Sequence, residues 1–309
     1  MNHSIDAAEP RRLLLATDLS AHCDRALERA RLLAAEWRAE LAILTVHEGP
    51  DVPAEVIGWL DGDREQHGAE AAAQRALLRD FEGSGVTPSL HLADGPVADA
   101  IPATAARLRS TLVVSGSARA ETLGHLLLGS TVERLARTLT QPLLVVRQRA
   151  RAPYRRILVP TDFSAASRLA LETACALFPE CAVTLFHAQQ GGMEALAGQT
   201  GADAAPARDA CARFLDGCRL PAGARARLEV VIAAGNLDSL LARHVQEHAI
   251  ELAVIGLHEQ PGVLRVLMGS TVERLLRGLA CDAIVMRMVV RAADDDDDDV
   301  AGNSPPRPG

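Results

Sequence analysis

The chain has 309 residues, of which 48% are apolar and 23% charged, the composition of a soluble globular protein of about two domains. Its formal net charge is −8, which argues against the overall basic surface that nucleic-acid binding requires. All 32 lysine-or-arginine positions are arginine, so a P-loop lysine and a Schiff-base lysine are excluded.

In the first half, short apolar runs alternate with segments in which apolar residues recur at helical spacing. Strands are expected at residues 13–16, 41–46, 86–92, 111–115 and 143–146. Helices are expected at residues 21–37, 64–81, 97–108 and from 129 onward, with loops at 48–63 and 116–128.

The same pattern occurs a second time. The sequence Gly-Ser-Thr-Val-Glu-Arg-Leu at residues 129–135 recurs letter for letter at residues 269–275, an offset of 140 (269 − 129). Strands are expected at residues 157–160, 183–188, 228–233, 252–255 and 283–288, and helices up to 178, at 203–218, at 237–248 and from 269 onward. This duplication predicts domains at residues 1–149 and 150–292.

Two charged segments lie outside these elements. The arginine-rich segment 147–156 is expected to be a linker between the halves. Residues 293–309 include six consecutive aspartates, Asp294 to Asp299, and are expected to form an acidic disordered tail.

Each half alternates strand and helix five times, which predicts a parallel sheet covered by helices on both faces. Right-handed crossovers make such a sheet doubly wound. The predicted fold class is therefore α/β, with two tandem Rossmann-like domains, each built on a five-stranded parallel sheet.

In a doubly wound sheet, ligands bind beyond the carboxyl ends of the strands. Three repeated features are expected at that edge: an aspartate after the first strand, a glycine after the fourth, and a Gly-Ser turn before the last helix. The residues are Asp18, Gly116, Gly129 and Ser130 in the first half, and Asp162, Gly256, Gly269 and Ser270 in the second. A carboxylate can accept hydrogen bonds from a base or sugar, and a helix N-terminus can hold phosphates.

Each feature also has a purely structural interpretation, and the alternatives stay open at this point. The two serines head a Ser-x-x-Glu capping box with Glu133 and Glu273. The two aspartates compete with Ser20 and Ser164 to cap the helix that follows. The two glycines can simply end a strand in a tight turn.

Together these motifs resemble the universal stress protein family in its tandem, two-domain form. The resemblance covers residues 11–149 and 153–291 and rests on the opening strand with Asp-x-Ser, the apolar strand before the loop, the leucine-rich lead into Gly-Ser, and the closing apolar strand. It implies an adenine nucleotide alpha hydrolase-like fold for each domain. It also implies that the closing strands pair, here within one chain, so that the chain forms a pseudo-dimer.

Family members that bind ATP carry a loop of pattern G-x2-G-x9-G-[ST]. The second glycine is replaced by Arg119 in the first half and by Glu259 in the second. An arginine can still contact a phosphate, whereas a glutamate repels it, so the first domain is the better candidate. A backbone contact to adenine maps to Val46 in the first half and Ala188 in the second. The resemblance thus implies a ligand set of Asp18, Val46, Gly116, Arg119, Gly129 and Ser130, and a weaker set of Asp162, Ala188, Gly256, Gly269 and Ser270.

The resemblance implies a non-enzymatic stress-response or regulatory protein, with ATP or another adenine nucleotide as the candidate ligand of the first domain and no other cofactor. The alternative is an interaction module that binds no nucleotide and acts through an unidentified protein partner, which Arg119 and Glu259 favour. Slow ATP hydrolysis ranks last, because Asp18 is the only candidate metal ligand for it. A homodimer is a further option.

Other site types are not expected. His244 and His248 stand four apart on an expected helix, a metal-compatible spacing, but no third ligand accompanies them, so no metal site is predicted. The six cysteines include no CxxC pair and are expected to be reduced thiols. No segment has the pattern of a secretory signal or a membrane span, so we expect a cytoplasmic protein without membrane or nucleic-acid partners.

Overall fold

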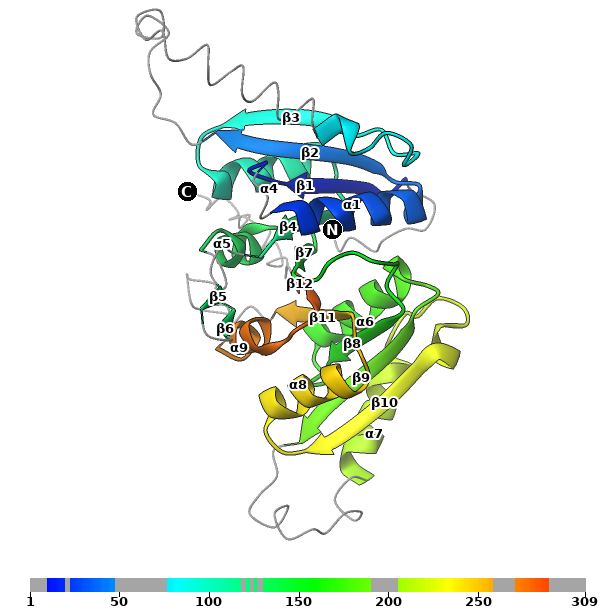
Figure 1. Ribbon diagram of the computed structural model, residues 1–309. Coiled ribbons are helices and arrows are strands. Elements are labelled where there is room, and N and C mark those ends of the chain that lie inside the picture. The colour runs from blue at the N-terminus through cyan, green and yellow to red at the C-terminus, as the bar shows by residue number, and fades with distance from the viewer. Residues whose placement is uncertain are drawn as a thin grey trace, which may run out of the picture.

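The computed structural model describes residues 10–19, 23–47, 77–117, 121–122, 125–126, 130–189, 205–257 and 270–288 (Figure 1). Expected elements that fall elsewhere, such as most of the helix at 64–81, lie outside the described residues.

The first half follows the expected order of strands and helices. Its elements are β1 Arg12–Ala16, α1 Asp24–Trp37, β2 Glu40–His47, β3 Ser89–Asp94, α4 Val97–Arg107, β4 Leu112–Gly116, β5 Glu121–Thr122, β6 His125–Leu126, α5 Ser130–Thr138 and β7 Leu143–Val146. β5 and β6 form a small antiparallel hairpin inside the segment that was expected to be loop. β3 begins three residues later than expected, after a turn in which the Ser84 hydroxyl accepts from the Val86 N–H at 3.2 Å.

The second half repeats this order. Its elements are β8 Arg156–Pro160, α6 Ala165–Leu177, β9 Ala182–Gln189, α7 Ala205–Asp216, the short 3₁₀ helix η3 Ala224–Arg227, β10 Leu228–Ala234, α8 Leu237–Glu247, β11 Leu252–Leu257, α9 Ser270–Gly278 and β12 Asp282–Arg287.

The main strands of both halves form a single ten-stranded sheet in the order β10-β9-β8-β11-β12-β7-β4-β1-β2-β3. Strands within each half pair in parallel, as in β1 with β2 and β8 with β9. The two halves join where β12 pairs antiparallel with β7, with Ile284 opposite Leu144. Each half is therefore a five-stranded Rossmann-like domain, which confirms the predicted fold class, and the closing strands do pair within the chain.

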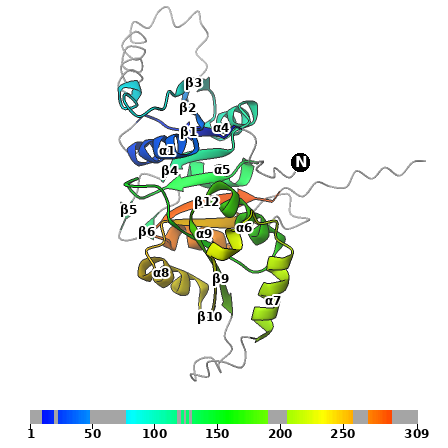
Figure 2. The same ribbon diagram turned by 90° about the vertical axis from the view of Figure 1, so that its right-hand side faces the viewer.

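Helices cover both faces of this sheet because the strands are apolar on both sides. Along β1, Leu13 and Leu15 pack beneath α1, whereas Leu14 faces the opposite cluster with α4 and α5. In the second half α6 and α7 cover one face and α8 and α9 the other, so that α7 and α8 stand on opposite sides of β9 and β10 (Figure 2). Burial of each large aliphatic side chain stabilises the fold by about 1.5–3 kcal/mol.

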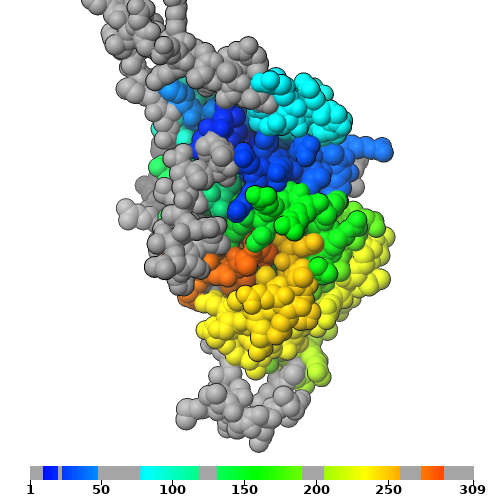
Figure 3. All heavy atoms as spheres, in the orientation of Figure 1, coloured from blue at the N-terminus to red at the C-terminus, as the bar shows by residue number. Residues whose placement is uncertain are grey.

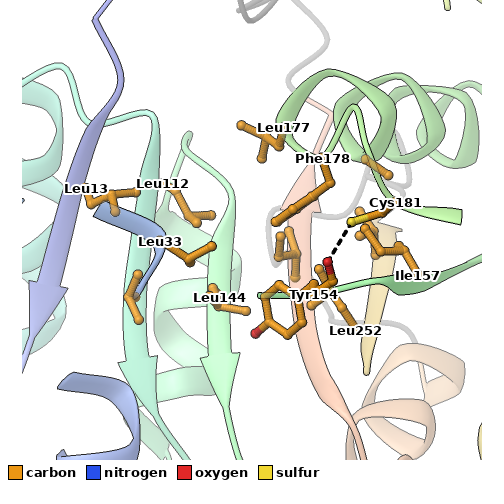
Figure 4. Close-up of a cluster of buried hydrophobic side chains, with 14 of the residues drawn as sticks. Leu13, Leu33, Leu112, Leu144, Tyr154, Ile157, Leu177, Phe178, Cys181 and Leu252 are labelled. Atoms are coloured by element: carbon orange, nitrogen blue, oxygen red, sulfur yellow. Dashed lines mark hydrogen bonds between the residues drawn. The ribbon is translucent and has the colours of Figure 1, made fainter. Parts of the chain in front are cut away.

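Both apolar clusters continue from one half into the other. Figure 4 shows Leu144 of the first half beside Tyr154 and Leu252, with Phe178 above them. The ring of Phe178 lies 5.4 Å from Trp37 and 5.7 Å from Tyr154, so an aromatic group spans the junction. In the space-filling view the blue atoms of the first half pack against green atoms, beyond which the orange and yellow atoms of the second half follow (Figure 3). The halves thus share one core, as two layers of helices on a continuous sheet.

The segment 147–156, expected to be a linker, joins the halves and is also part of their interface. Asp282, at the start of β12, has 0% of its surface exposed. One of its carboxylate oxygens accepts from the backbone N–H groups of Arg147 at 2.7 Å and Gln148 at 2.8 Å. The other accepts from the Tyr154 hydroxyl at 2.6 Å and lies 3.5 Å from the Arg29 guanidinium. We call these five residues the Asp282 cluster.

Within the Asp282 cluster the buried carboxylate is fully hydrogen-bonded and lies beside a guanidinium, which offsets the cost of burying its charge. Arg29 is 4% exposed; its guanidinium stacks 3.9 Å from the Tyr154 ring and donates to the Ala152 carbonyl at 2.9 Å. Burial, reinforced by the charge of Asp282, raises the pKa of Tyr154 well above its ordinary value, so the phenol remains a donor. The first half (Arg29), the connecting segment (Tyr154) and the second half (Asp282) are thereby held in one arrangement.

Candidate functional site

The antiparallel junction decides where the two candidate sites lie. Within each half the strands are parallel, so their carboxyl ends share one edge. Because β12 runs opposite to β7, the carboxyl edges of the two halves face in opposite directions. The chain therefore carries two separate candidate sites, one at each long edge of the sheet.

The turn after the first strand has the same strained shape in both halves. Leu19 has φ of 57° and Phe163 has φ of 64°, in the left-handed region that costs a residue with a Cβ about 1–2 kcal/mol. In each turn a threonine hydroxyl accepts the N–H of that residue, at 3.0 Å from Thr17 and 2.9 Å from Thr161. Backbone strain of this kind clusters at functional sites, and in both halves the strained residue directly follows the candidate aspartate, Asp18 or Asp162.

Neither aspartate is the N-cap of the helix that follows it, because the N-cap of α1 is Cys23 and that of α6 is Ser164. Ser164 is the N-cap of α6 and accepts from the Ser167 N–H at 3.2 Å, while Asp162 accepts from the Ser164 N–H at 3.1 Å. The serine, not the aspartate, therefore caps α6. In the first half, Asp18 is exposed and one of its oxygens accepts from the thiol of Cys23 at 3.1 Å. Burial is the largest cause that raises the pKa of Cys23, so that thiol stays protonated and donates.

Val46 and Ala188 point their backbone groups toward the aspartate turns. The Thr17 N–H donates to the Leu44 carbonyl, so Leu44 faces β1, whereas the Gly95 N–H donates to the His47 carbonyl on the other side of β2. Backbone direction alternates along a strand, so Val46 faces the same side as Leu44, just past Ala16 at the end of β1. The second half repeats this arrangement. The Thr161 N–H donates to the Phe186 carbonyl and the Gly235 N–H to the Gln189 carbonyl, so the backbone groups of Ala188 face the end of β8.

Gly116 ends β4 as expected, whereas β11 continues one residue beyond Gly256, to Leu257. Gly116 pairs with Val146, and Gly256 pairs with Met286. At Gly256 an added Cβ would lie 2.2 Å from the Ala166 carbonyl oxygen, a distance that no Cβ tolerates. Glycine is therefore required there by the close approach of α6, whether or not a ligand binds.

The remaining predicted residues are less completely placed. Ser130 and Ser270 begin α5 and α9, as the heptapeptides predicted, but their side chains lie outside the described part of the chain, so capping by them stays a prediction. Arg119, Gly129, Gly269 and Glu259 also fall outside the described residues. Glu133 and Glu273, the glutamates of the capping boxes, lie 3.6 Å and 2.5 Å from the guanidinium of Arg277.

The second-half turn carries an aromatic pair that the first half lacks. The rings of Phe163 and His187 stack at 4.3 Å, and Nδ1 of His187 lies 2.9 Å from the Thr161 carbonyl. The corresponding residues of the first half are Leu19 and Thr45. The two edges thus share a backbone plan but differ in side chains.

The sequence interpretation missed one repeated feature of this edge. Gly95 and Gly235 follow β3 and β10 with φ of 104° and 139°, conformations that favour glycine. Their N–H groups continue the pairing of β2 and β9 beyond the last strand residues. The signal was present as a glycine recurring at the 140-residue offset (235 − 95).

The histidine pair of α8 is a packed pair of rings. His244 and His248 stack at 3.9 Å, and Nδ1 of His248 lies 3.2 Å from the His244 carbonyl. Among the residues that the structure describes, no group of three or more histidine, cysteine or acidic side chains is arranged to hold a metal ion.

Comparison with known proteins identifies the family. Residues 9–147 and residues 153–287 each match the sequence model of the universal stress protein family. The chain belongs to the universal stress protein family. It carries two copies of the universal stress protein domain in tandem, as the repeated heptapeptide indicated.

Solved structures share this tandem universal stress protein fold. A universal stress protein from Archaeoglobus fulgidus DSM 4304 superposes with a TM-score of 0.65 at 18% identity, covering 89% of this chain and 98% of that one. A protein of unknown function from Pseudomonas aeruginosa PAO1 superposes with a TM-score of 0.63 at 20% identity, covering 90% of this chain and 92% of that one. No curated protein matches the chain in sequence. None of the described helices has the length and apolarity of a membrane span.

Proposed function

We propose that the chain is a non-enzymatic regulatory protein whose first domain binds an adenine nucleotide. The observation that carries the proposal is the direction of the Val46 backbone, which faces the edge where the strained turn presents Asp18. A backbone donor and acceptor beside a carboxylate suit the edge of a purine and the hydroxyls of a ribose. The N-terminus of α5 lies at the same carboxyl edge of the sheet, where phosphates are favoured.

The first domain is preferred over the second for two reasons. The second-domain loop carries Glu259 where the ATP-binding pattern has a glycine, and a glutamate repels phosphate. Asp162 already accepts from the Ser164 N–H, and its turn is filled by the stacked pair Phe163 and His187. Asp18 accepts from the thiol of Cys23, a weak donor that a ribose hydroxyl can replace.

A bound nucleotide would act by changing a surface or a partner contact. The two halves share one sheet, one core and the fully buried Asp282. A large rotation of one half against the other would break all three, so the ligand is expected to reorganise the edge around Asp18 and leave the domain arrangement as it is.

The test is calorimetric titration of ATP into the parent protein and two matched variants, Asp18→Ala and Asp162→Ala. The parent is expected to bind ATP, and Asp18→Ala to weaken binding by about tenfold to a hundredfold, since hydrogen bonds to a charged group contribute about 1.5–3 kcal/mol. Asp162→Ala is expected to change the affinity by less than about twofold, within the scatter of a surface substitution. A double variant, Gly129→Ala with Ser130→Ala, tests the phosphate end of the site.

The rival functions give different results. No heat with ATP in the parent would reject nucleotide binding and favour the interaction module. Equal losses in Asp18→Ala and Asp162→Ala would reject the preference for the first domain. Release of ADP by the parent, absent from Asp18→Ala, would show that the protein hydrolyses ATP and is not a simple binding protein.

A further inference from the structure

Two equivalent arginines cross between the halves. Arg147 follows β7 and Arg287 ends β12, 140 positions apart (287 − 147). Arg147 donates to the carbonyl of Leu279 at 2.7 Å and to that of Leu276, at the C-terminal end of α9. Arg287 donates to the carbonyl of Arg137 at 2.9 Å, at the C-terminal end of α5. Each domain thus supplies an arginine to the C-terminal end of the other domain's last helix.

The contact is a favourable one for each helix. The last carbonyls of a helix have no partner within it, and the helix dipole places partial negative charge there. An arginine side chain satisfies both by hydrogen bonding and by charge. Arg147 is 4% exposed, and burial is the main cause that lowers its pKa from the ordinary value, with Cys281 and Asp282 opposing the shift.

The two arginines also begin at the candidate sites. β7 runs beside β4 up to the pair of Val146 with Gly116, and the Ser117 N–H donates to the Val146 carbonyl. Arg147 is therefore the next residue after the strand end that borders the first site. In the second domain, Arg287 itself pairs with Leu257, next to Gly256. Each arginine starts at the edge of one site and ends on the helix whose N-terminus lies at the other.

The two helices make a second contact, between the C-terminal end of α9 and the N-terminal half of α5. The guanidinium of Arg277 on α9 lies 2.5 Å from Glu273 of its own helix and 3.6 Å from Glu133 of α5. This pair is partly exposed, so its energy is small, but it joins the end of α9 to the N-terminal half of α5. α5 is therefore contacted from the second domain at both ends of its length.

We propose that Arg287 is a positioning residue for the nucleotide site of the first domain, acting across the domain junction through α5. This inference rests on the nucleotide binding proposed above. Arg147 has the corresponding role for α9 and the second edge. A universal stress protein domain of this chain is therefore completed by its tandem neighbour, and the site at Asp18 requires a side chain 269 positions away (287 − 18).

Arg287 is the better residue to test because it lies outside the Asp282 cluster. The backbone of Arg147 is anchored by Asp282, so replacing Arg147 disturbs the buried cluster. The position equivalent to Asp282 in the first half is Pro142, which offers no side-chain acceptor to the backbone near Arg287. Arg287 is partly exposed and donates to the Arg137 carbonyl at the C-terminal end of α5.

The experiment compares the parent with Arg287→Ala, Arg287→Lys and the control Arg243→Ala, an exposed arginine of the same domain on α8. ATP affinity is expected to fall about fivefold to tenfold in Arg287→Ala and to stay within about twofold of the parent in Arg287→Lys and Arg243→Ala. Hydrogen exchange of the ligand-free proteins is measured alongside. In Arg287→Ala, amides of α5 are expected to exchange faster while those of α8, in the domain that carries the substitution, do not change.

The two readouts separate the two proposals. If the parent binds no ATP, the proposed function fails and the exchange pattern alone decides whether Arg287 positions α5. If the parent binds ATP and Arg287→Ala binds equally well, the positioning role is overturned. Faster exchange confined to the second domain, with α5 unchanged, overturns it as well.

Discussion

Replacing Asp282 by asparagine tests whether the two halves are one folding unit. The asparagine oxygen can still accept from the N–H groups of Arg147 and Gln148, now 2.7 Å and 2.8 Å from the carboxylate. The side-chain NH₂ of the asparagine, however, would replace the carboxylate oxygen that faces Tyr154 and Arg29, and an NH₂ group cannot accept from either. The buried Arg29 guanidinium would also lose its counter-charge. Breaking a buried ion pair from one side costs about 3–5 kcal/mol, so Asp282→Asn is expected to lower the free energy of unfolding by that amount.

The matched control is Asp238→Asn, in the same half. Asp238 pairs with Arg274 at 2.8 Å, but the two side chains are 33% and 54% exposed. An exposed pair contributes at most about 1 kcal/mol, and the control should lose no more than that.

Urea unfolding followed by circular dichroism and by tryptophan fluorescence measures both variants. Trp37 of the first half contacts Phe178 of the second, so its fluorescence reports on the junction. In Asp282→Asn both probes should shift together, because the first half loses its partner surface when the second unfolds. A loss below about 1 kcal/mol, or one equal to that of Asp238→Asn, would refute this account of the cluster.

Two further predictions concern packing and pH. Gly256→Ala should lower the free energy of unfolding in urea by about 1–3 kcal/mol, because the new Cβ would lie 2.2 Å from the Ala166 carbonyl oxygen. The control Gly278→Ala, whose Cβ would have nothing within 4 Å, should be nearly neutral, and equal effects of the two substitutions would contradict the close approach of α6. Burial, and then the charge of His248, lowers the pKa of His244 from its ordinary 6.5, so its contribution to stability is complete above about pH 6.5 and is lost as the pH falls through the lowered value. Melting temperatures from pH 7.5 to 5 should therefore fall less steeply in His244→Leu than in the parent, and parallel curves would show that His244 is not responsible.

Much of the fold could be predicted because the duplication supplied each element twice. β7, four consecutive apolar residues between Pro142 and Arg147, was predicted to the residue, since a short run buried on both faces has clear ends. β3 was placed too early because it is an edge strand with one neighbour, and its register follows β2 and not its own apolar pattern.

The Asp282 cluster could not be predicted, because its contacts join residues far apart in the chain. The Tyr154 hydroxyl and Asp282 are 128 positions apart, and no local pattern encodes such a pair. The repeat gave no help either, since the first half carries Pro142 where the second carries Asp282.

The candidate site was partly predictable for the same reason. Motif spacing placed Asp18 at this edge and the family resemblance added Val46, and the structure adds the direction of the Val46 backbone, on which the proposed recognition rests. The arginines Arg147 and Arg287 were invisible to the sequence interpretation, because their role depends on the antiparallel junction that only the assembled sheet reveals.

The most direct test of the account is the number of nucleotides that one chain holds. Native mass spectrometry of the protein in saturating ATP should show one bound nucleotide per chain, and Asp18→Ala should show none at the same concentration. A parent that holds no nucleotide, or two, would contradict a site confined to the first domain.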